Sequence, residues 1–144
     1  MESPVRRAAA VADPKNAQVR PEPDVRKRLS GPALRTFFNI AGAWGLSVAD
    51  QRALLGWPAA STYHKYKARD HGALSYDTLT RLSLILGIYK SLQVLYPDQR
   101  FADAWMRMPN SNPAFAGATP LSLAVNTGID GLYRIRRLLD ARRG

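Results

Sequence analysis

Apolar residues recur every three or four positions through most of this chain, and this spacing is the feature that most limits its fold. The large apolar side chains fall on one helical face between residues 34 and 44, and again over 79–95 and 129–139. No stretch alternates apolar and polar residues at the period of two that a half-buried strand requires. The sequence therefore predicts an all-α fold.

Capping residues and helix breakers divide the apolar stripes into separate helices. Ser47, Ser75 and Thr119 each precede a stripe, where a side-chain oxygen accepts a backbone N–H of the first turn. Gly45 ends the first helix, as glycine commonly does. Gly87 is expected to bend or split the longest one. The expected helices cover 32–44, 47–55, 60–69, 75–96, 102–108, 119–127 and 130–143.

Residues 1–29 differ in composition from the rest. They contain four prolines and no aromatic residue, with seven Lys or Arg against four Asp or Glu. Such a segment buries too little apolar surface to offset the entropy lost on ordering. We expect a disordered basic tail over 1–29, which is either a plain leader or an arm along DNA phosphates. The remainder is expected to divide into domains at 30–74 and 75–144.

The chain is strongly basic, with 21 Lys or Arg against 11 Asp or Glu and a net charge of +10. A field of this sign attracts polyanions. Nucleic acid is the leading candidate, and an acidic protein or an anionic membrane surface are the others. The remaining interpretation is that the charge only keeps the protein soluble.

Several functional classes lose support because their residues are missing. The chain has no cysteine, so disulfides and thiolate metal sites are excluded. Its two histidines, His64 and His71, lack an acidic partner in a metal-site pattern, and no phosphate loop or nucleophile elbow occurs. No apolar run is long enough to cross a membrane. We expect a cytoplasmic protein that is not an enzyme and uses no cofactor or metal.

The strongest local motif is a helix-turn-helix. A short helix ends at Leu55-Gly56, a tight connection follows, and the next helix carries the polar and basic residues that suit the major groove. Tyr63 and Tyr66 are expected to pack inward. The outward residues, predicted to contact DNA, are Ser61, Thr62, His64, Lys65, Lys67 and Arg69. The alternative is an ordinary helical hairpin with a solvated face.

The C-terminal half carries a second set of ordered motifs. They are Gly87-Ile88-Tyr89-Lys90, Leu95-Tyr96-Pro97, Trp105, Pro109-Asn110, Phe115-Ala116-Gly117, Pro120-Leu121, and Gly131-Leu132 leading to Arg136-Arg137-Leu138-Leu139. In these residues, and over 30–144 as a whole, the chain resembles the Xre/MbcA/ParS-type antitoxins. The tail lies outside the resemblance.

The resemblance implies an Xre-like helix-turn-helix domain followed by a small helical toxin-binding domain. It also implies a type II toxin–antitoxin system, whose toxin is a RES-domain protein that consumes NAD. Such a toxin is neutralised when the antitoxin's C-terminal region contacts its active-site cleft. Members of the family commonly bind their own operator and self-associate, so autorepression and a homodimer are expected. The alternative is a stand-alone transcription regulator whose C-terminal domain only dimerises.

The residues expected to bind the toxin lie between Trp105 and the end of the chain. The arginines of the last helix either meet acidic toxin residues or point into solvent. Trp105 and Phe115 are either contact residues or core, and Asn110 is either a recognition or a turn residue. The predicted set is Trp105, Asn110, Phe115, Arg136, Arg137, Arg142, Arg143 and Gly144.

Two further expectations concern whole elements. The long helix over 75–96 is the expected dimer surface, because it carries many apolar residues. Deleting residues 130–144 is expected to abolish neutralisation while sparing the helix-turn-helix.

Overall fold

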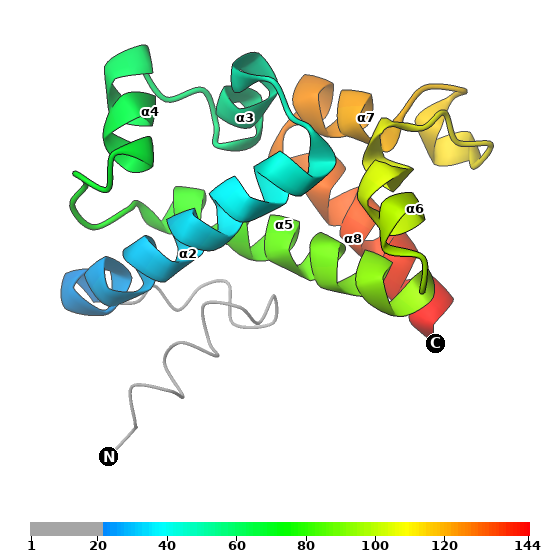
Figure 1. Cartoon of the computed structure of the whole chain (residues 1–144), viewed down its shortest axis with the longest axis horizontal. Helices are drawn as coiled ribbons and strands as arrows, with labels where there is room; N and C mark the ends of the chain where they lie inside the picture. The colour runs from blue at the N-terminus through cyan, green and yellow to red at the C-terminus, as the bar shows by residue number, and fades with distance from the viewer. Residues whose placement is uncertain (1–21) are drawn as a thin grey trace.

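Residues 22–144 are described by a computed structural model, and within this range every regular element is a helix (Figure 1). The elements are α2 (Pro23–Trp44), α3 (Val48–Leu54), α4 (Ala60–Lys67), α5 (Tyr76–Leu95), α6 (Gln99–Ala104), α7 (Pro120–Thr127) and α8 (Ile129–Arg143). Two short 3-10 helices, η2 (Trp105–Arg107) and η3 (Pro113–Phe115), lie between α6 and α7. The predicted all-α class is confirmed.

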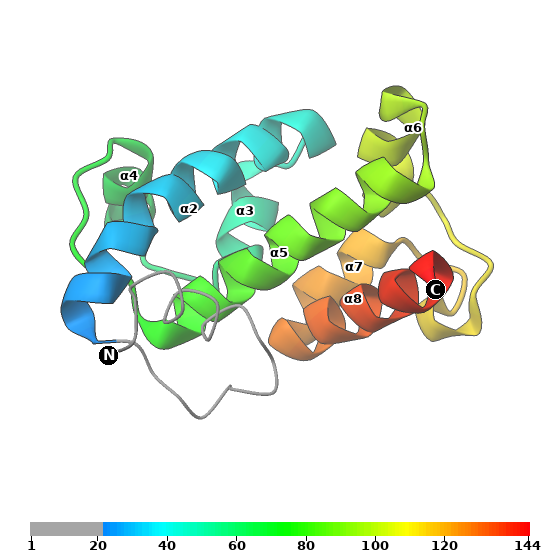
Figure 2. The same ribbon diagram turned by 90° about the horizontal axis from the view of Figure 1, so that it is seen from below.

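α5 is the central helix of the molecule. It lies between α2 on one side and α8 on the other, and α8 runs in the same direction as α5 (Figures 1 and 2). Ile88 and Leu92 of α5 are fully buried in one core with Trp44 of α2 and Ile135 of α8. A helix that is apolar on more than one side is covered on more than one side.

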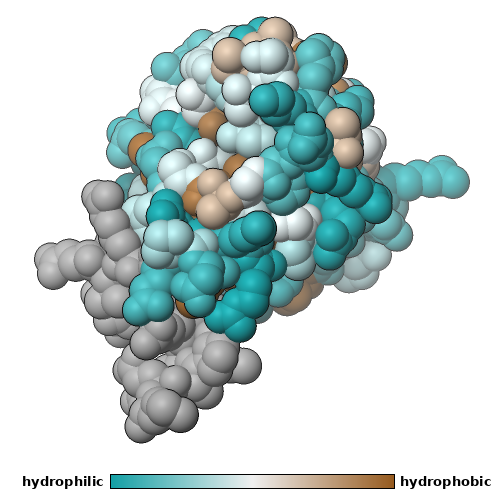
Figure 3. Space-filling view, turned by 90° about the vertical axis from the view of Figure 1, so that its left-hand side faces the viewer, coloured by the Kyte–Doolittle hydropathy of each residue, from teal (hydrophilic) through white to brown (hydrophobic). Residues whose placement is uncertain are grey.

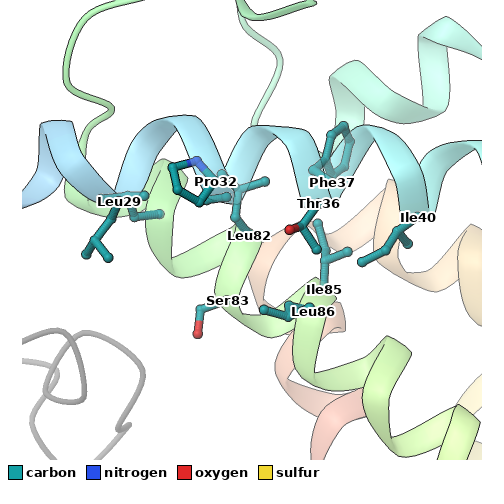
Figure 4. A pocket seen from close by; sticks show the side chains of 11 residues that line it. Leu29, Pro32, Thr36, Phe37, Ile40, Leu82, Ser83, Ile85 and Leu86 are labelled. Carbon is teal, nitrogen blue, oxygen red and sulfur yellow. The ribbon is translucent and has the colours of Figure 1, made fainter. Parts of the chain in front are cut away.

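This packing covers most of the apolar residues of α5 within one chain, so only part of the expected dimer surface on this helix remains exposed. An apolar groove remains open between α2 and α5 (Figure 4). Its lining residues are Leu29, Pro32, Ala33, Thr36, Phe37, Ile40, Leu79, Leu82, Ser83, Ile85 and Leu86.

The first described helix begins earlier than the sequence predicted. α2 begins at Pro23, and Pro32 lies inside the helix instead of in its first turn. Val25 is buried, and the buried Ser30 hydroxyl accepts the N–H of Leu74 at 2.9 Å. These tertiary contacts offset the ordering cost that the composition of residues 23–29 suggested was prohibitive. The rest of the predicted tail, residues 1–21, lies outside the described residues.

The predicted helix starts are confirmed at three caps. Ser47 accepts the N–H of Asp50 at 3.0 Å, Ser75 that of Thr78 at 3.1 Å, and Thr119 that of Ser122 at 3.1 Å. These bonds satisfy backbone donors that the first turn of a helix leaves free. The helix expected over 102–108 instead starts at Gln99 and tightens into the 3-10 turn η2 after Ala104.

Gly87 neither bends nor splits α5, which is continuous from Tyr76 to Leu95. Its missing side chain makes room for α8, because a Cβ at this position would overlap the guanidinium group of Arg136. The glycine therefore leaves room for the Arg136 side chain of α8 to lie against α5.

Candidate functional site

A buried chain of hydrogen bonds fixes α4 against α3. The Tyr63 hydroxyl donates to Gln51 Oε1 at 2.6 Å, and Gln51 Nε2 donates to the carbonyl of Leu46 at 3.1 Å. The ring of Tyr63 also packs edge-on against Phe38 of α2. Burial raises the pKa of Tyr63 above its ordinary value of 10.0, so the phenol remains a donor at neutral pH. These contacts set the angle at which α4 leaves the turn.

The turn between α3 and α4 has unusual backbone geometry. Gly56 has φ 90° and Trp57, a bulky residue, has φ 60°. The Arg52 guanidinium stabilises this turn, since it donates to the carbonyl of Pro58 at 2.9 and 3.1 Å and lies 6.0 Å from the Trp57 ring centroid. Trp57 is still 58% exposed. The sequence prediction missed this residue, although a tryptophan beside a turn glycine was a visible signal.

The six residues predicted to contact DNA lie on or just after α4, away from the core. Ser61, His64, Lys65, Lys67 and Arg69 are exposed and Thr62 is half-buried. Tyr63 is buried and Tyr66 half-buried, as expected for the inward side. Viewed towards α4 and the first turns of α2, the surface is mainly hydrophilic (Figure 3). The arrangement suits phosphate and base-edge contacts, and DNA contact itself stays a prediction.

A cation that the sequence prediction missed joins this surface from α2. Arg35 lines one cavity together with Lys67, Arg69 and His71. Two acids lie nearby: Asp70 is exposed beside Arg69 and lowers the positive charge, and Asp77 is paired with Arg81 of α5 at 3.0 Å. The positive face therefore combines α4 with α2. Only the fold brings positions 35 and 67–71 together.

Two of the predicted toxin contacts are corrected. Trp105 is 3% exposed and Phe115 4%, and their rings pack edge-on with centroids 6.1 Å apart. Both are core residues, so they support the C-terminal surface from within. Asn110 is half-buried, and its Oδ1 accepts the N–H of Asn112 at 2.9 Å. That bond supports the turn interpretation of Asn110.

The arginines of α8 differ in what they contact. Arg136 pairs with Asp140 at 3.2 Å, Arg142 donates to the Tyr96 hydroxyl at 3.2 Å, and Arg143 donates to Ser91 Oγ at 3.2 Å. Three of the four predicted arginines thus have partners within the chain, two of them in residues outside α8. Arg137 is exposed and Gly144 ends the chain beside them. Their contact with a toxin stays a prediction.

Within residues 22–144 no group of His, Asp and Glu residues could hold a metal ion. None of the described helices is both long and apolar enough to cross a membrane.

Comparison with known proteins divides the chain into two matched regions. Residues 24–87 match the family described as the antitoxin Xre-like helix-turn-helix domain. Residues 91–144 match the family described as the antitoxin Xre/MbcA/ParS C-terminal toxin-binding domain. The chain is also 44% identical over 111 residues to the uncharacterized protein y4oB of Sinorhizobium fredii (strain NBRC 101917 / NGR234), covering 77% of this chain and 84% of that one. No solved structure matches the chain.

Proposed function

Because this chain belongs to the Xre/MbcA/ParS antitoxins, a non-enzymatic family with a helix-turn-helix domain and a toxin-binding domain, we propose that its toxin is a RES-domain enzyme that degrades NAD. The proposal places the toxin against residues 91–144. The observation that carries it is the last two turns of α8, where Arg137, Arg142 and Arg143 are exposed. A cationic surface of this kind suits a cleft that has acidic groups at its rim.

We also propose that the protein represses its own operon. Support comes from α4, whose outward face carries Lys65, Lys67 and a hydroxyl at Ser61, and from Arg35 beside it. A homodimer would present two copies of α4 to half-sites about 34–36 Å apart. The groove between α2 and α5 is the apolar surface that we assign to the dimer contact.

Co-expression with the toxin encoded in the same operon tests neutralisation. We expect cells to survive only when both proteins are made, and the two proteins to purify as one complex. If the toxin remains lethal and this chain elutes alone, the alternative of a stand-alone transcription regulator gains the support instead.

Autorepression is tested separately, by a mobility-shift assay on the DNA upstream of the operon. We expect binding at low salt that weakens as salt increases, because the contacts release counterions from phosphates. If the protein does not shift this DNA at low salt, the proposal of autorepression is overturned and the proposal of neutralisation is unaffected.

A further inference from the structure

An aromatic and cationic cluster lies at the corner where α5, α6 and α8 meet. The rings of Tyr96 and Phe101 are 4.9 Å apart between centroids, and Arg142 donates to the Tyr96 hydroxyl at 3.2 Å. We call these three residues the corner cluster. It joins the residue after α5, the third residue of α6 and the end of α8, which lies near the C-terminus (Figure 1).

The corner cluster is exposed although its residue types favour burial. Phe101 is 43% exposed, one of four large apolar side chains in residues 22–144 that remain exposed. Arg142 is exposed and Tyr96 half-buried. Tyrosine, phenylalanine and arginine are enriched at protein interfaces, and tyrosine and arginine are enriched among the residues that carry most of the binding energy.

The cluster is also held in place before any partner arrives. Tyr96 has two contacts, one from its ring to the Phe101 ring and one from its hydroxyl to the Arg142 guanidinium. Arg143, next in the chain, donates to Ser91 of α5 and so holds the end of α8 against α5. A preformed contact surface loses less conformational entropy on binding than a mobile one.

The surrounding charges indicate the chemistry of the partner. The charged side chains within two residues of the cluster are three arginines, Arg100, Arg142 and Arg143, and three carboxylates, Asp98, Asp103 and Asp140. Asp103 accepts from Gln93 Nε2 at 3.1 Å and Asp140 pairs with Arg136, whereas Arg142 and Arg143 donate to hydroxyl groups, which leave their charges uncompensated. Asp98 caps α6 by accepting the N–H of Arg100 at 3.0 Å. An apolar centre with a mainly positive rim is complementary to an apolar pocket bordered by carboxylates.

We propose that the corner cluster is the anchor by which this protein docks its toxin, with Phe101 entering an apolar pocket and Arg142 pairing with a carboxylate at the rim. The proposal deepens and rests on the proposed function. Every residue of the cluster lies within 91–144, the region matched to the toxin-binding domain. Phe101 and Tyr96 extend the contact beyond the arginine-bearing end of α8.

The test measures the affinity of the purified full chain for the toxin of its operon, by calorimetry or biolayer interferometry. We expect Phe101→Ala and Arg142→Ala each to weaken binding about tenfold or more. Trp57→Ala is the control, because Trp57 is an exposed aromatic residue in the helix-turn-helix half, at 58% against 43% for Phe101. We expect its affinity to stay within about twofold of wild type.

A charge pair at position 101 keeps the test independent of folding. Phe101→Lys and Phe101→Glu remove the same ring, and in the first turn of α6 glutamate favours the helix more than lysine does. Weaker binding by the glutamate variant therefore does not come from a less stable helix. We expect the glutamate variant to bind more weakly than the lysine variant, because the partner rim is acidic. Thermal unfolding by circular dichroism verifies that both variants are folded.

The outcomes separate this inference from the function on which it rests. If wild-type protein does not bind the toxin, the proposed function fails and the inference fails with it. If wild type binds and the Phe101 variants bind equally well, only the corner cluster is overturned. The same follows if Trp57→Ala loses as much affinity as Phe101→Ala, or if the lysine variant binds more weakly than the glutamate variant.

Discussion

The guanidinium group of Arg81 lies directly against Gly56, so that a Cβ at position 56 would stand 3.0 Å from Arg81 Nε. Arg81 is held there by Asp77, and its side chain is 15% exposed. It also reaches Gly128, where a Cβ would lie 3.7 Å from one of its nitrogens. One arginine of α5 therefore contacts both the α3–α4 turn and the turn between α7 and α8.

Replacing Gly56 with alanine is expected to destabilise the protein by about 1–3 kcal/mol. The residue has φ 90°, which an L side chain rarely adopts, and the new methyl group would displace Arg81. Chemical denaturation measures the change. Gly72→Ala is the control, since a Cβ at Gly72 meets no atom within 4 Å. Equal stability of the two variants would show that the Arg81 contact is unimportant.

Tyr63→Phe is expected to cost about 1–3 kcal/mol of folding free energy, because it leaves Gln51 Oε1 buried without its donor. The control is Tyr133→Phe, which removes a half-buried phenol for which the structure shows no hydrogen bond. Thermal or urea unfolding compares the two. A loss no greater than that of the control would contradict the role assigned to this bond.

The same tyrosine predicts how stability changes at alkaline pH. Burial raises the pKa of Tyr63 in the folded state above 10.0, so the folded state retains its proton longer than the unfolded state does. Its contribution is therefore fully present below pH 10 and is lost as the pH rises through the folded pKa. We expect unfolding free energy to fall above pH 10, and to fall less steeply in Tyr63→Phe. If the free energy of unfolding falls equally with pH in wild type and in Tyr63→Phe, the effect does not come from Tyr63.

The positive face around α4 predicts a set of salt dependences. Lys65→Ala, Lys67→Ala, Arg69→Ala and Arg35→Ala are each expected to lower the slope of log K against log salt by about one when the residue contacts a phosphate. Arg100→Ala removes an exposed arginine in α6 and should leave the slope unchanged. Titrations of operator DNA at several salt concentrations supply the slopes. If the slope is unchanged in Arg35→Ala, Arg35 does not contact a phosphate and the DNA interface does not extend from α4 to α2.

Arg137 is the most direct test of the end of α8 as a toxin contact. We expect Arg137→Glu to weaken toxin binding about tenfold or more, since reversing the charge of an exposed contact repels an acidic partner. Arg134→Glu is the control on the same helix, near Asp130 and farther from the C-terminus.

Point variants replace deletion of residues 130–144, because Leu132, Ile135 and Leu139 of α8 fill the core. From this packing we expect such a deletion to expose the core that α8 shares with α2 and α5, whereas the sequence alone predicted that it would spare the helix-turn-helix.

The apolar groove between α2 and α5 predicts the oligomeric state. Leu86→Glu places a charge in the groove, and we expect the variant to be monomeric at concentrations where wild type is dimeric. Light scattering coupled to size exclusion measures the mass. Val94→Glu is the control, because Val94 is exposed on the same helix and does not line the groove. A dimeric Leu86→Glu would move the dimer contact elsewhere.

Local signals in the sequence predicted much of the fold. Ser47, Ser75 and Thr119 act through bonds that span three residues, so their capping role was visible in the sequence itself. The start of α2 was not, because Ser30 bonds with Leu74, 44 residues away. Burial of Val25 likewise depends on the folded chain.

The candidate sites show the same division. The outward face of α4 follows from helical periodicity, and all six predicted residues lie on or just after it. Arg35 joins them only through packing of α2 beside α4. At the other end, hydrophobicity alone could not separate buried Trp105 from exposed Phe101, since the difference is set by which helices cover each ring.

The two matched families meet between residues 87 and 91, in the middle of α5. Ile88 lies in that interval and Leu92 directly follows it, and both are completely enclosed by side chains from α2 and α8. A chimera joined at this boundary would inherit half of a helix from each parent and a mismatched interior. The helix-turn-helix half and the toxin-binding half are therefore interchangeable between relatives only where the sequences of α2, α5 and α8 are compatible.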